Sequence, residues 1–269
     1  MILDGKVLSD KLYKELNVSK RSKLIILTVG EDPASKVYVK NKIKACEKVG
    51  IQHEHITLDD MTEYEFATYV TDLIESNVKS VFNFGIILQL PAPEKYVKVF
   101  NMVVPPSYDV DGFGYWNRLK LYLEEETPSH YPATPRGILT LLDNYEIPII
   151  GKHVVIIGRS EIVGKPLAKM MMNRNATVTV CHSKTENLEK ITKTADILVV
   201  AIGKPKFINS SHIKDGVTII DVGINRTESG LCGDVDFDDI KDKCYAITPV
   251  PGGVGPMTVY SLIENVVIQ

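Results

Sequence analysis

The chain has 269 residues, of which 44% are hydrophobic and 24% charged, and its formal net charge is −3 at pH 7. This length suits one large domain or two medium ones, and the composition is that of an ordinary globular enzyme. The chain lacks the excess of positive charge that is typical of proteins that bind nucleic acid or anionic membranes. No apolar run approaches the roughly 20 residues of a membrane helix. With an acid at position 4 and no long apolar N-terminal run, the sequence predicts a cytoplasmic protein that binds neither nucleic acid nor membrane.

The four cysteines are widely separated, and none belongs to a C-x-x-C pair: Cys46, Cys181, Cys232 and Cys244. Zinc sites usually draw on such pairs, so we expect no metal site here. Scattered cysteines in a cytosolic chain are typical of reduced thiols. Cys46 falls within a helical pattern and Cys181 ends an apolar run, which indicates packing roles for both.

Apolar strand-like runs alternate with helical patterns through the first part of the chain. Residues 23–30 (KLIILTVG) and 51–58 read as strands, and a third strand lies within 80–90. The helix between the first two ends at Gly50, since glycine is favoured just past a helix C-terminus. A second helix is predicted over 62–76. This alternation favours parallel β-α-β units.

A second series of the same kind begins near position 151. Its predicted elements are a strand at 153–158, a helix reaching about residue 174, and strands at 177–182, 196–203 and 217–223. The polar segment 121–131 separates the two series and is predicted to connect two domains, at 1–125 and 126–256. The final run, 257–269, has helical apolar spacing and is predicted to cross back and complete the first domain.

The turn after the strand at 153–158 has the features of a dinucleotide-binding loop. Gly158 allows a tight turn, and Gly164 permits close packing of the following helix against the strand. The N-terminus of that helix can hold a phosphate through its free N–H groups. A glycine turn alone is a weak signal, but its setting within a full β-α-β unit favours dinucleotide binding.

The end of the next strand distinguishes between two cofactors. An NAD site usually carries Asp or Glu there, to bind the ribose 2′-hydroxyl. This chain has Cys181-His182-Ser183-Lys184-Thr185, with no carboxylate. His182, Ser183 and the nearby Arg159 suit a 2′-phosphate, so the sequence predicts NADP. The alternative for His182 and Ser183 is ordinary loop polarity.

Candidate catalytic residues occur in the first series. Tyr38 and Lys42 lie four residues apart and share one helix face, although spacing alone would equally fit a surface lysine beside a half-buried tyrosine. Gln89 ends a predicted buried strand, where ligands bind in open α/β sheets. The segment 109–113 (DVDGF) lies in a later loop.

A loop rich in proline and glycine lies near the end of the chain, at 248–258 (TPVPGGVGPMT). Proline fixes φ, and glycine permits backbone conformations closed to other residues. We therefore predict a stiff, sharply bent loop that a planar ligand can approach closely. A rigid turn without function is the alternative.

These motifs together resemble the bifunctional methylenetetrahydrofolate dehydrogenase/methenyltetrahydrofolate cyclohydrolase family. The matching strings run in family order along the whole chain: YVKNK with ACE, GIILQLP, DVDGF, TPRG, GRS with IVG, DVGIN, GDV and PVPGGVGPMT. The chain departs from the family pattern at Ala133, where cysteine is usual, and at Gly114-Tyr115-Trp116, where a His-Pro stretch is usual.

The resemblance implies two α/β domains flanking a cleft, the C-terminal one a Rossmann-type NADP-binding domain with a mostly parallel sheet. It implies oxidation of 5,10-methylenetetrahydrofolate by NADP, followed by hydrolysis of the 5,10-methenyl product to 10-formyltetrahydrofolate. It also implies a homodimer.

The resemblance also assigns roles to individual residues. Lys42 assists proton transfer, Gln89 holds Lys42, Tyr38 stacks on the folate, and Asp111 bonds the pterin edge. The folate side of the site is lined by Pro251, Gly252 and Gly253. The predicted cofactor contacts are Gly158, Arg159, Ser160, Gly164, His182, Ser183 and Ile224.

Three other functions compete with this one. A dehydrogenase without cyclohydrolase activity is disfavoured by the presence of both Lys42 and Gln89. A nucleotide-binding regulatory protein without chemistry is disfavoured by the presence of Lys42 and Asp111. An unrelated two-domain NADP dehydrogenase, such as a shikimate-dehydrogenase-like enzyme, is disfavoured by the loop 248–258.

Overall fold

The computed structural model describes residues 1–19, 22–30, 33–79, 83–123, 129–228 and 230–268. The chain divides into two compact units. Unit 1 comprises Met1–Lys11 and Thr134–Thr258, and unit 2 comprises Leu12–Ala133 and Val259–Gln269. The predicted domain limits, 1–125 and 126–256, stay a prediction, because the point between them lies outside the described residues.

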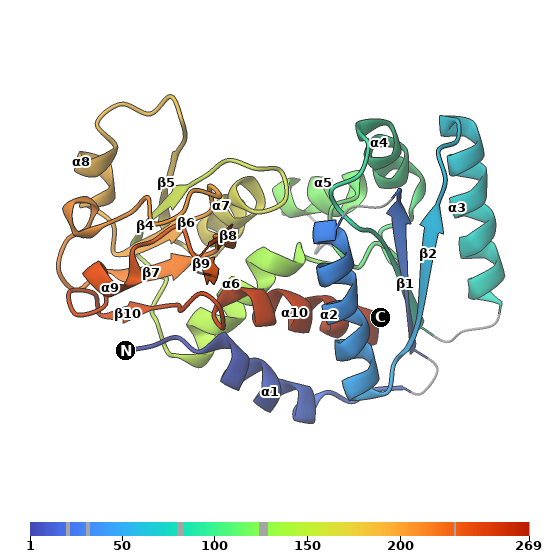
Figure 1. Cartoon of the computed structure of the whole chain (residues 1–269), viewed down its shortest axis with the longest axis horizontal. Helices are drawn as coiled ribbons and strands as arrows, with labels where there is room; N and C mark the ends of the chain where they lie inside the picture. Colours follow the sequence, from blue (N-terminus) through green and yellow to red (C-terminus); the bar gives the residue numbers. More distant parts are fainter. Residues whose placement is uncertain (20–21, 31–32, 80–82, 124–128, 229, 269) are drawn as a thin grey trace. The chain divides into compact units, whose positions relative to one another are not determined.

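Unit 2 is built on a three-stranded parallel sheet in the order β2-β1-β3 (Figure 1). Its strands and helices are β1 (Ser22–Val29), α2 (Pro33–Val49), β2 (Gln52–Leu58), α3 (Glu63–Val78), β3 (Asn83–Leu88), α4 (Glu94–Val103) and α5 (Tyr115–Leu123). The predicted strands and helices of the first series are therefore confirmed. Gly50, at φ +77°, follows the last residue of α2 as the sequence predicted.

Helices cover both faces of β1 and β3, which explains why these two strands are buried along nearly their whole length, whereas the edge strand β2 (QHEHITL) is largely exposed. Along β1, Ile25 and Leu27 pack with side chains of α3 and α4. The alternate residues, Leu24 and Ile26, pack with α2 and with α10 (Val254–Val267). The C-terminal helix thus contributes Leu262, Ile263 and Val266 to the core of unit 2.

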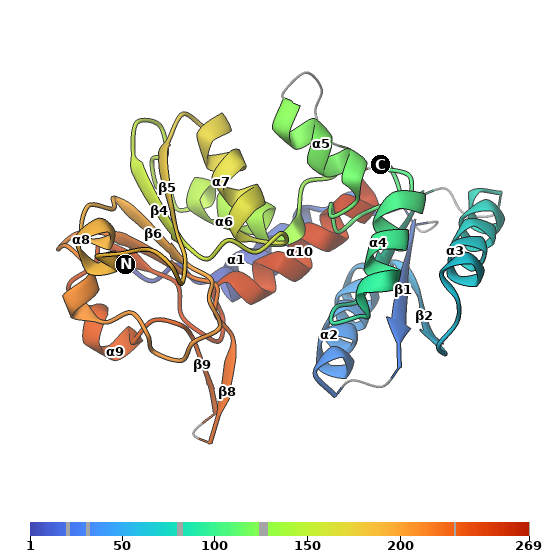
Figure 2. The ribbon, with the colours of Figure 1, turned by 90° about the horizontal axis from the view of Figure 1, so that it is seen from above.

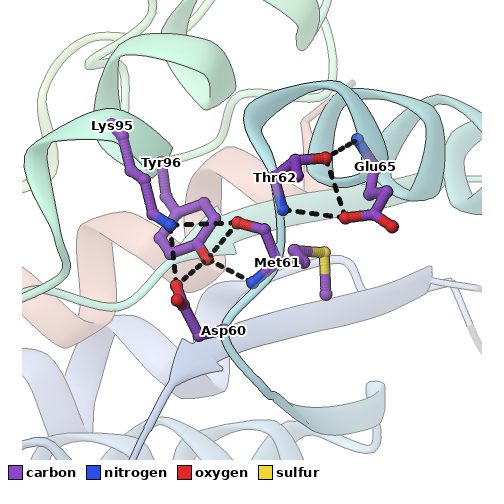
Figure 3. Close-up of polar contacts among 6 residues, drawn as sticks. All are labelled: Asp60, Met61, Thr62, Glu65, Lys95 and Tyr96. Atoms are coloured by element: carbon purple, nitrogen blue, oxygen red, sulfur yellow. Dashed lines mark hydrogen bonds and ion pairs between the residues drawn. The ribbon is translucent and has the colours of Figure 1, made fainter.

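A hydrogen-bonded cluster attaches α4 to the loop between β2 and α3 (Figure 3). The buried Tyr96 hydroxyl accepts from the Met61 amide at 2.7 Å and donates to Asp60 Oδ1 at 2.5 Å. Lys95 Nζ donates to the same carboxylate oxygen at 2.7 Å. Thr62 and Glu65 form a capping box that begins α3.

Unit 1 is built on a five-stranded parallel sheet in the order β10-β7-β6-β4-β5. Its strands are β4 (His153–Ile157), β5 (Thr177–Cys181), β6 (Ile197–Val200), β7 (Thr218–Asp221) and β10 (Ala246–Ile247). The chain enters at β4, moves outward to β5, then returns past β4 to β6. In such sheets the ligand binds at this reversal, outside the carboxyl ends of the strands.

Shorter elements surround this sheet. These are α7 (Gly164–Asn173), α8 (Leu188–Thr192), the 3₁₀ helix η1 (Ser210–His212), α9 (Phe237–Ile240) and the antiparallel strands β8 (Asn225–Thr227) and β9 (Gly230–Cys232). Figure 2 shows the β8–β9 ribbon projecting beyond the five strands. The mostly parallel sheet that was predicted for the C-terminal part of the chain is confirmed.

Helices at three places were not predicted correctly. Neither α1 (Gly5–Glu15) nor α6 (Ala133–Asn144) was predicted from the sequence, and the last helix was predicted to begin only at residue 257. In the structure α10 begins at Val254, three residues before the predicted start at 257, so the loop ends at Gly253. Pro135 and Pro256 lie in the first turns of α6 and α10, where an amide needs no intrahelical partner, so proline does not prevent the helix.

The predicted connection at 121–131 is also partly wrong. Its first residues, through Leu123, are the last turn of α5. Residues 124–128 lie outside the described part of the chain.

Replacing Tyr96 with phenylalanine is expected to destabilise unit 2 by about 1–3 kcal/mol. The change removes the hydroxyl that pairs with Met61 and Asp60 and leaves a buried amide without its partner. Tyr64→Phe in α3 is the matched control, because Tyr64 is 81% exposed, and its effect should stay within about 0.5 kcal/mol. Urea unfolding of the variants measures both, and equal effects would contradict the structural role given to the Tyr96 hydroxyl.

Candidate active site

Three of the predicted catalytic side chains meet in unit 2. Lys42 Nζ, on α2, donates to Gln89 Oε1 at 3.0 Å, and Gln89 directly follows β3. Lys42 Nζ lies 4.0 Å from Asp111 Oδ2, and the two side chains are only 12% and 15% exposed. Gln89 Nε2 donates to the Leu90 carbonyl at 2.7 Å, which turns the amide oxygen toward Lys42.

Asp111 reaches this place because its segment runs beside β3. The Ile86 amide donates to the Tyr108 carbonyl at 2.8 Å, and Ile86 pairs with Asp109 in an isolated parallel bridge. From α10, the buried Asn265 donates its side-chain amide to the Val110 carbonyl at 2.8 Å. The loop before Asp111 is therefore fixed on two sides.

Asp109 is a buried carboxylate that the sequence analysis did not single out. It accepts from the Gly114 amide at 2.7 Å and from Asn117 Nδ2 at 2.9 Å. Burial raises the pKa of Asp109 to about 6, the hydrogen bonds of Asn117 and Gly114 oppose this rise, and the charge of Asp111 adds to it. A Cβ at Gly114 would lie 2.8 Å from Asp109 Oδ2, so this departure from the family pattern leaves room for the carboxylate.

Tyr38 lies one helical turn before Lys42 on α2 and is 43% exposed. Its neighbour Val39 is buried in the core, whereas the tyrosine side chain is partly accessible to solvent. An exposed aromatic ring one turn from Lys42 is available to stack on a planar ligand.

The predicted nucleotide turn of unit 1 has the backbone geometry that its glycines suggested. Gly158 has φ +121°, and a Cβ there would lie 2.2 Å from the Ala201 carbonyl oxygen at the end of β6. A Cβ at Gly164 would lie 2.1 Å from the Gly158 carbonyl oxygen. Ser160 Oγ accepts from the amides of Val163 and Gly164 at 3.2 and 3.4 Å and so caps the start of α7. The turn is compact enough for backbone to approach a pyrophosphate.

The end of β5 presents polar groups without a carboxylate. The His182 amide donates to Thr185 Oγ1 at 2.9 Å, and His182 Nδ1 accepts from the Lys184 amide at 3.2 Å. Arg159 and Ser183 are exposed. These are the residues expected for a 2′-phosphate, and their chemistry fits that group.

The remaining predicted residues lie in two other loops of unit 1. Ile224, 45% exposed, lies between β7 and β8. After β10 the loop carries Pro251, Gly252 at φ +110°, and Gly253. The Gly252 carbonyl accepts from the Lys6 amide at 2.8 Å, which attaches the loop to the start of α1.

Sequence reasoning also missed the buried carboxylates Asp221 and Asp234, although both stand in motifs that were quoted. Burial raises the pKa of Asp221 to about 7, opposed by the amides of Asp234 and Val235. The sequence signal that could have indicated them is the nearby glycines, Gly223 and Gly233, because a residue without a side chain leaves room for a buried carboxylate.

No group of three or more His, Cys, Asp and Glu side chains in the part of the chain that the structure describes is placed to hold a metal ion. Among the described helices, none is long and apolar enough to cross a membrane.

The fold and these side chains define a class of α/β enzyme. Unit 1 has the sheet order and glycine turn of a dinucleotide-binding domain, and unit 2 carries a lysine held by an amide beside a carboxylate.

Comparisons with known proteins place the chain within that class. The model of the tetrahydrofolate dehydrogenase/cyclohydrolase catalytic domain matches residues 3–111, and the model of the NAD(P)-binding domain of the same family matches residues 132–269. The chain belongs to the tetrahydrofolate dehydrogenase/cyclohydrolase family.

Individual relatives agree over nearly the full length. The bifunctional protein FolD of Methanoculleus marisnigri is 49% identical, covering 98% of this chain and 94% of the relative. The crystal structure of the bifunctional FolD enzyme of Campylobacter jejuni is 42% identical with a TM-score of 0.91, covering 99% and 96% of the two chains. A Trypanosoma brucei FolD structure, complexed with NADP cofactor and inhibitor, is 31% identical with a TM-score of 0.88, covering 99% and 95%.

The Asp109 carboxyl predicts a specific dependence of stability on pH. Its pKa rises from the usual 3.8 to about 6 on folding, so the folded state holds a proton that the unfolded state releases between these values. The stability contributed by this carboxyl is fully present below about pH 3.8 and is lost as the pH rises through about 6.

Asp109→Asn has no titrating group at this position. We compare the free energy of unfolding of the unaltered protein with that of Asp109→Asn. The first minus the second should fall by up to about 3 kcal/mol as the pH rises from 4 to 7. Urea unfolding over this range measures the difference, with the exposed Asp215→Asn as a control. A difference that stays constant, or that increases with pH, would contradict the raised pKa.

Proposed function

We propose that Lys42, Gln89, Asp111 and Tyr38 carry out two successive reactions on folate in this chain. The first is NADP-dependent oxidation of 5,10-methylenetetrahydrofolate, and the second is hydrolysis of the resulting 5,10-methenyltetrahydrofolate to 10-formyltetrahydrofolate. The observation that carries the proposal is the contact of Lys42 with Gln89 at 3.0 Å beside the Asp111 carboxylate.

The proposed cofactor is NADP, which accepts a hydride from the methylene carbon when bound. The turn from Gly158 to Gly164 would receive the pyrophosphate at the start of α7, because glycines without side chains let the backbone form this compact turn. Arg159, Ser183 and His182 would bind the 2′-phosphate. Ser160 and Ile224 are the remaining proposed contacts.

The proposed folate contacts orient the substrate for both steps. The Asp111 carboxylate can accept from paired N–H groups on the pterin edge. Tyr38 offers its exposed ring for stacking. The loop residues Pro251, Gly252 and Gly253 are proposed to line the folate side, since glycine allows a flat ring to approach the backbone.

In the hydrolysis step, Lys42 is proposed to move a proton. A water oxygen forms a bond to the methenyl carbon, and the water gives up a proton to the lysine amine. The bond from this carbon to N5 then breaks as the new hydroxyl group loses its proton and becomes the formyl carbonyl. N5 takes up one proton, and Lys42 releases the other to solvent, which leaves the formyl group on N10. Gln89 fixes the amine by accepting one of its hydrogens, and the Leu90 carbonyl fixes Gln89.

We further propose that the protein works in the cytoplasm as a homodimer. The four cysteines are unpaired, as expected in a reducing compartment. The homodimer rests on the family alone, and sedimentation equilibrium tests it.

Lys42→Met is expected to lower cyclohydrolase activity by about 10²- to 10⁴-fold, the usual loss when a positioned acid–base group is removed. Dehydrogenase activity should fall less, because hydride transfer itself needs no proton transfer. Separate assays with methylenetetrahydrofolate plus NADP and with methenyltetrahydrofolate alone measure the two activities.

The matched control is Lys44→Met, on an exposed position of the same helix, which should leave both activities unchanged. Full cyclohydrolase activity in Lys42→Met would exclude the proposed role of Lys42.

Arg159→Gln is expected to reduce the preference for NADP over NAD by roughly 10- to 100-fold, because it removes one charge-assisted contact to the 2′-phosphate. The ratio of kcat/KM for the two cofactors is the measurement. Arg226→Gln, an exposed arginine on β8, serves as the control and should leave the ratio unchanged. An unchanged ratio in Arg159→Gln would show that Arg159 does not bind the phosphate.

A further inference from the structure

Two buried aspartates of unit 1, Asp221 and Asp234, have no role in the chemistry described above. Both are almost inaccessible to solvent, at 3% and 0% exposed. Asp221 ends β7, and Asp234 follows β9. They lie where the chain leaves the carboxyl ends of the parallel strands, the edge at which dinucleotides bind in such sheets.

Asp234 gathers four N–H donors from two loops. Three are consecutive amides of the turn after β6, Ile202, Gly203 and Lys204, at 2.7, 2.9 and 2.7 Å. The fourth is Asn225 Nδ2, at 2.8 Å. An ionised carboxylate accepts all four, whereas an asparagine at 234 would offer a single acceptor oxygen and would turn its own N–H donors toward these amides.

Asp221 fixes the neighbouring turn and Asp234 itself. Its oxygens accept from the amides of Gly223 at 3.0 Å, Asp234 at 2.9 Å and Val235 at 3.0 Å. Each carboxylate packs closely against a glycine that lies next to or near the other aspartate in the sequence. A Cβ at Gly223 would lie 2.2 Å from Asp234 Cγ, and one at Gly233 would lie 1.7 Å from Asp221 Oδ2.

Ile224 is the residue whose position these bonds determine. Its neighbour Gly223 is bonded to Asp221, and its other neighbour, Asn225, is bonded to Asp234. Ile224 therefore lies between a backbone amide and a side chain that are both held by buried carboxylates, while its own side chain remains 45% exposed. The same carboxylate that holds Asn225 also holds the turn at 202–204, so the two loops are positioned together.

We propose that Asp234 is a positioning residue for NADP, which presents Ile224 and the turn at 202–204 to the cofactor, and that Asp221 holds Asp234 in place. The inference rests on the proposed use of NADP. It concerns only the cofactor half of the enzyme, so the cyclohydrolase reaction, which uses no NADP, provides an internal control.

The test compares Asp234→Asn with the unaltered enzyme in two measurements. Calorimetric titration with NADP alone gives the dissociation constant, and hydrolysis of methenyltetrahydrofolate gives the cyclohydrolase rate. We expect Asp234→Asn to raise the dissociation constant by roughly 10- to 100-fold, since small displacements of binding groups cost this much. The cyclohydrolase rate should remain within about twofold of the unaltered enzyme. Asp215→Asn, an exposed aspartate, should change neither.

A milder variant covers the case in which Asp234→Asn fails to fold. Asn225→Ala removes one side-chain donor and leaves the three backbone bonds of Asp234 intact. A weaker but measurable loss of NADP affinity with normal cyclohydrolase activity supports the proposal.

Two results would overturn the inference. Normal NADP affinity in folded Asp234→Asn, or in Asn225→Ala where the former does not fold, refutes the positioning role alone. Failure of the unaltered enzyme to bind NADP refutes the proposed cofactor, and the positioning role with it.

Discussion

Within each unit, the loops depend on one constraint: the backbone N–H groups need hydrogen-bond acceptors where the chain leaves the parallel sheet. Parallel strands end at a common edge, and the loops that follow carry amides that the sheet no longer pairs. Buried aspartates accept these amides: Asp109 in unit 2, and Asp221 and Asp234 in unit 1. Asp111 and Ile224, the residues proposed to contact the folate and the cofactor, lie within or beside the loops so fixed. The proposed ligand contacts therefore depend on the hydrogen bonds of buried aspartates.

Much of the fold could be predicted because its signals are local. The buried strands read as short apolar runs, and Gly50 and Gly158 mark a helix end and a tight turn through positive φ. The errors occurred where local chemistry supports two structures. Proline in a first helical turn resembles proline in a loop, so the starts of α6 and α10 were not recognised. In a strand that is covered on both faces, apolar and polar residues no longer alternate along the sequence. The ends of such a strand can therefore be predicted only to within about two residues.

The site could be predicted only in part. The spacing of Tyr38 and Lys42 gives a shared helix face, but the contact of Lys42 with Gln89 depends on how α2 packs on the sheet. The approach of Asp111 depends on the bridge between β3 and Asp109 and on the hydrogen bond from Asn265 to Val110, neither of which a local sequence pattern encodes. The family resemblance supplied what spacing did not. The roles of Asp109, Asp221 and Asp234 were missed because the residues next to an aspartate in the sequence do not show which hydrogen-bond donors surround it in the fold.

The most direct test of the account uses the unaltered protein with 5,10-methylenetetrahydrofolate and NADP, following reduced cofactor and methenyl absorbance separately. Two activities in one chain predict reduced cofactor with little methenyl accumulation, and much slower turnover with NAD. Methenyl product that accumulates one-for-one with reduced cofactor would mean that the Lys42 site does not hydrolyse it. Absence of turnover with either cofactor would contradict the folate assignment itself.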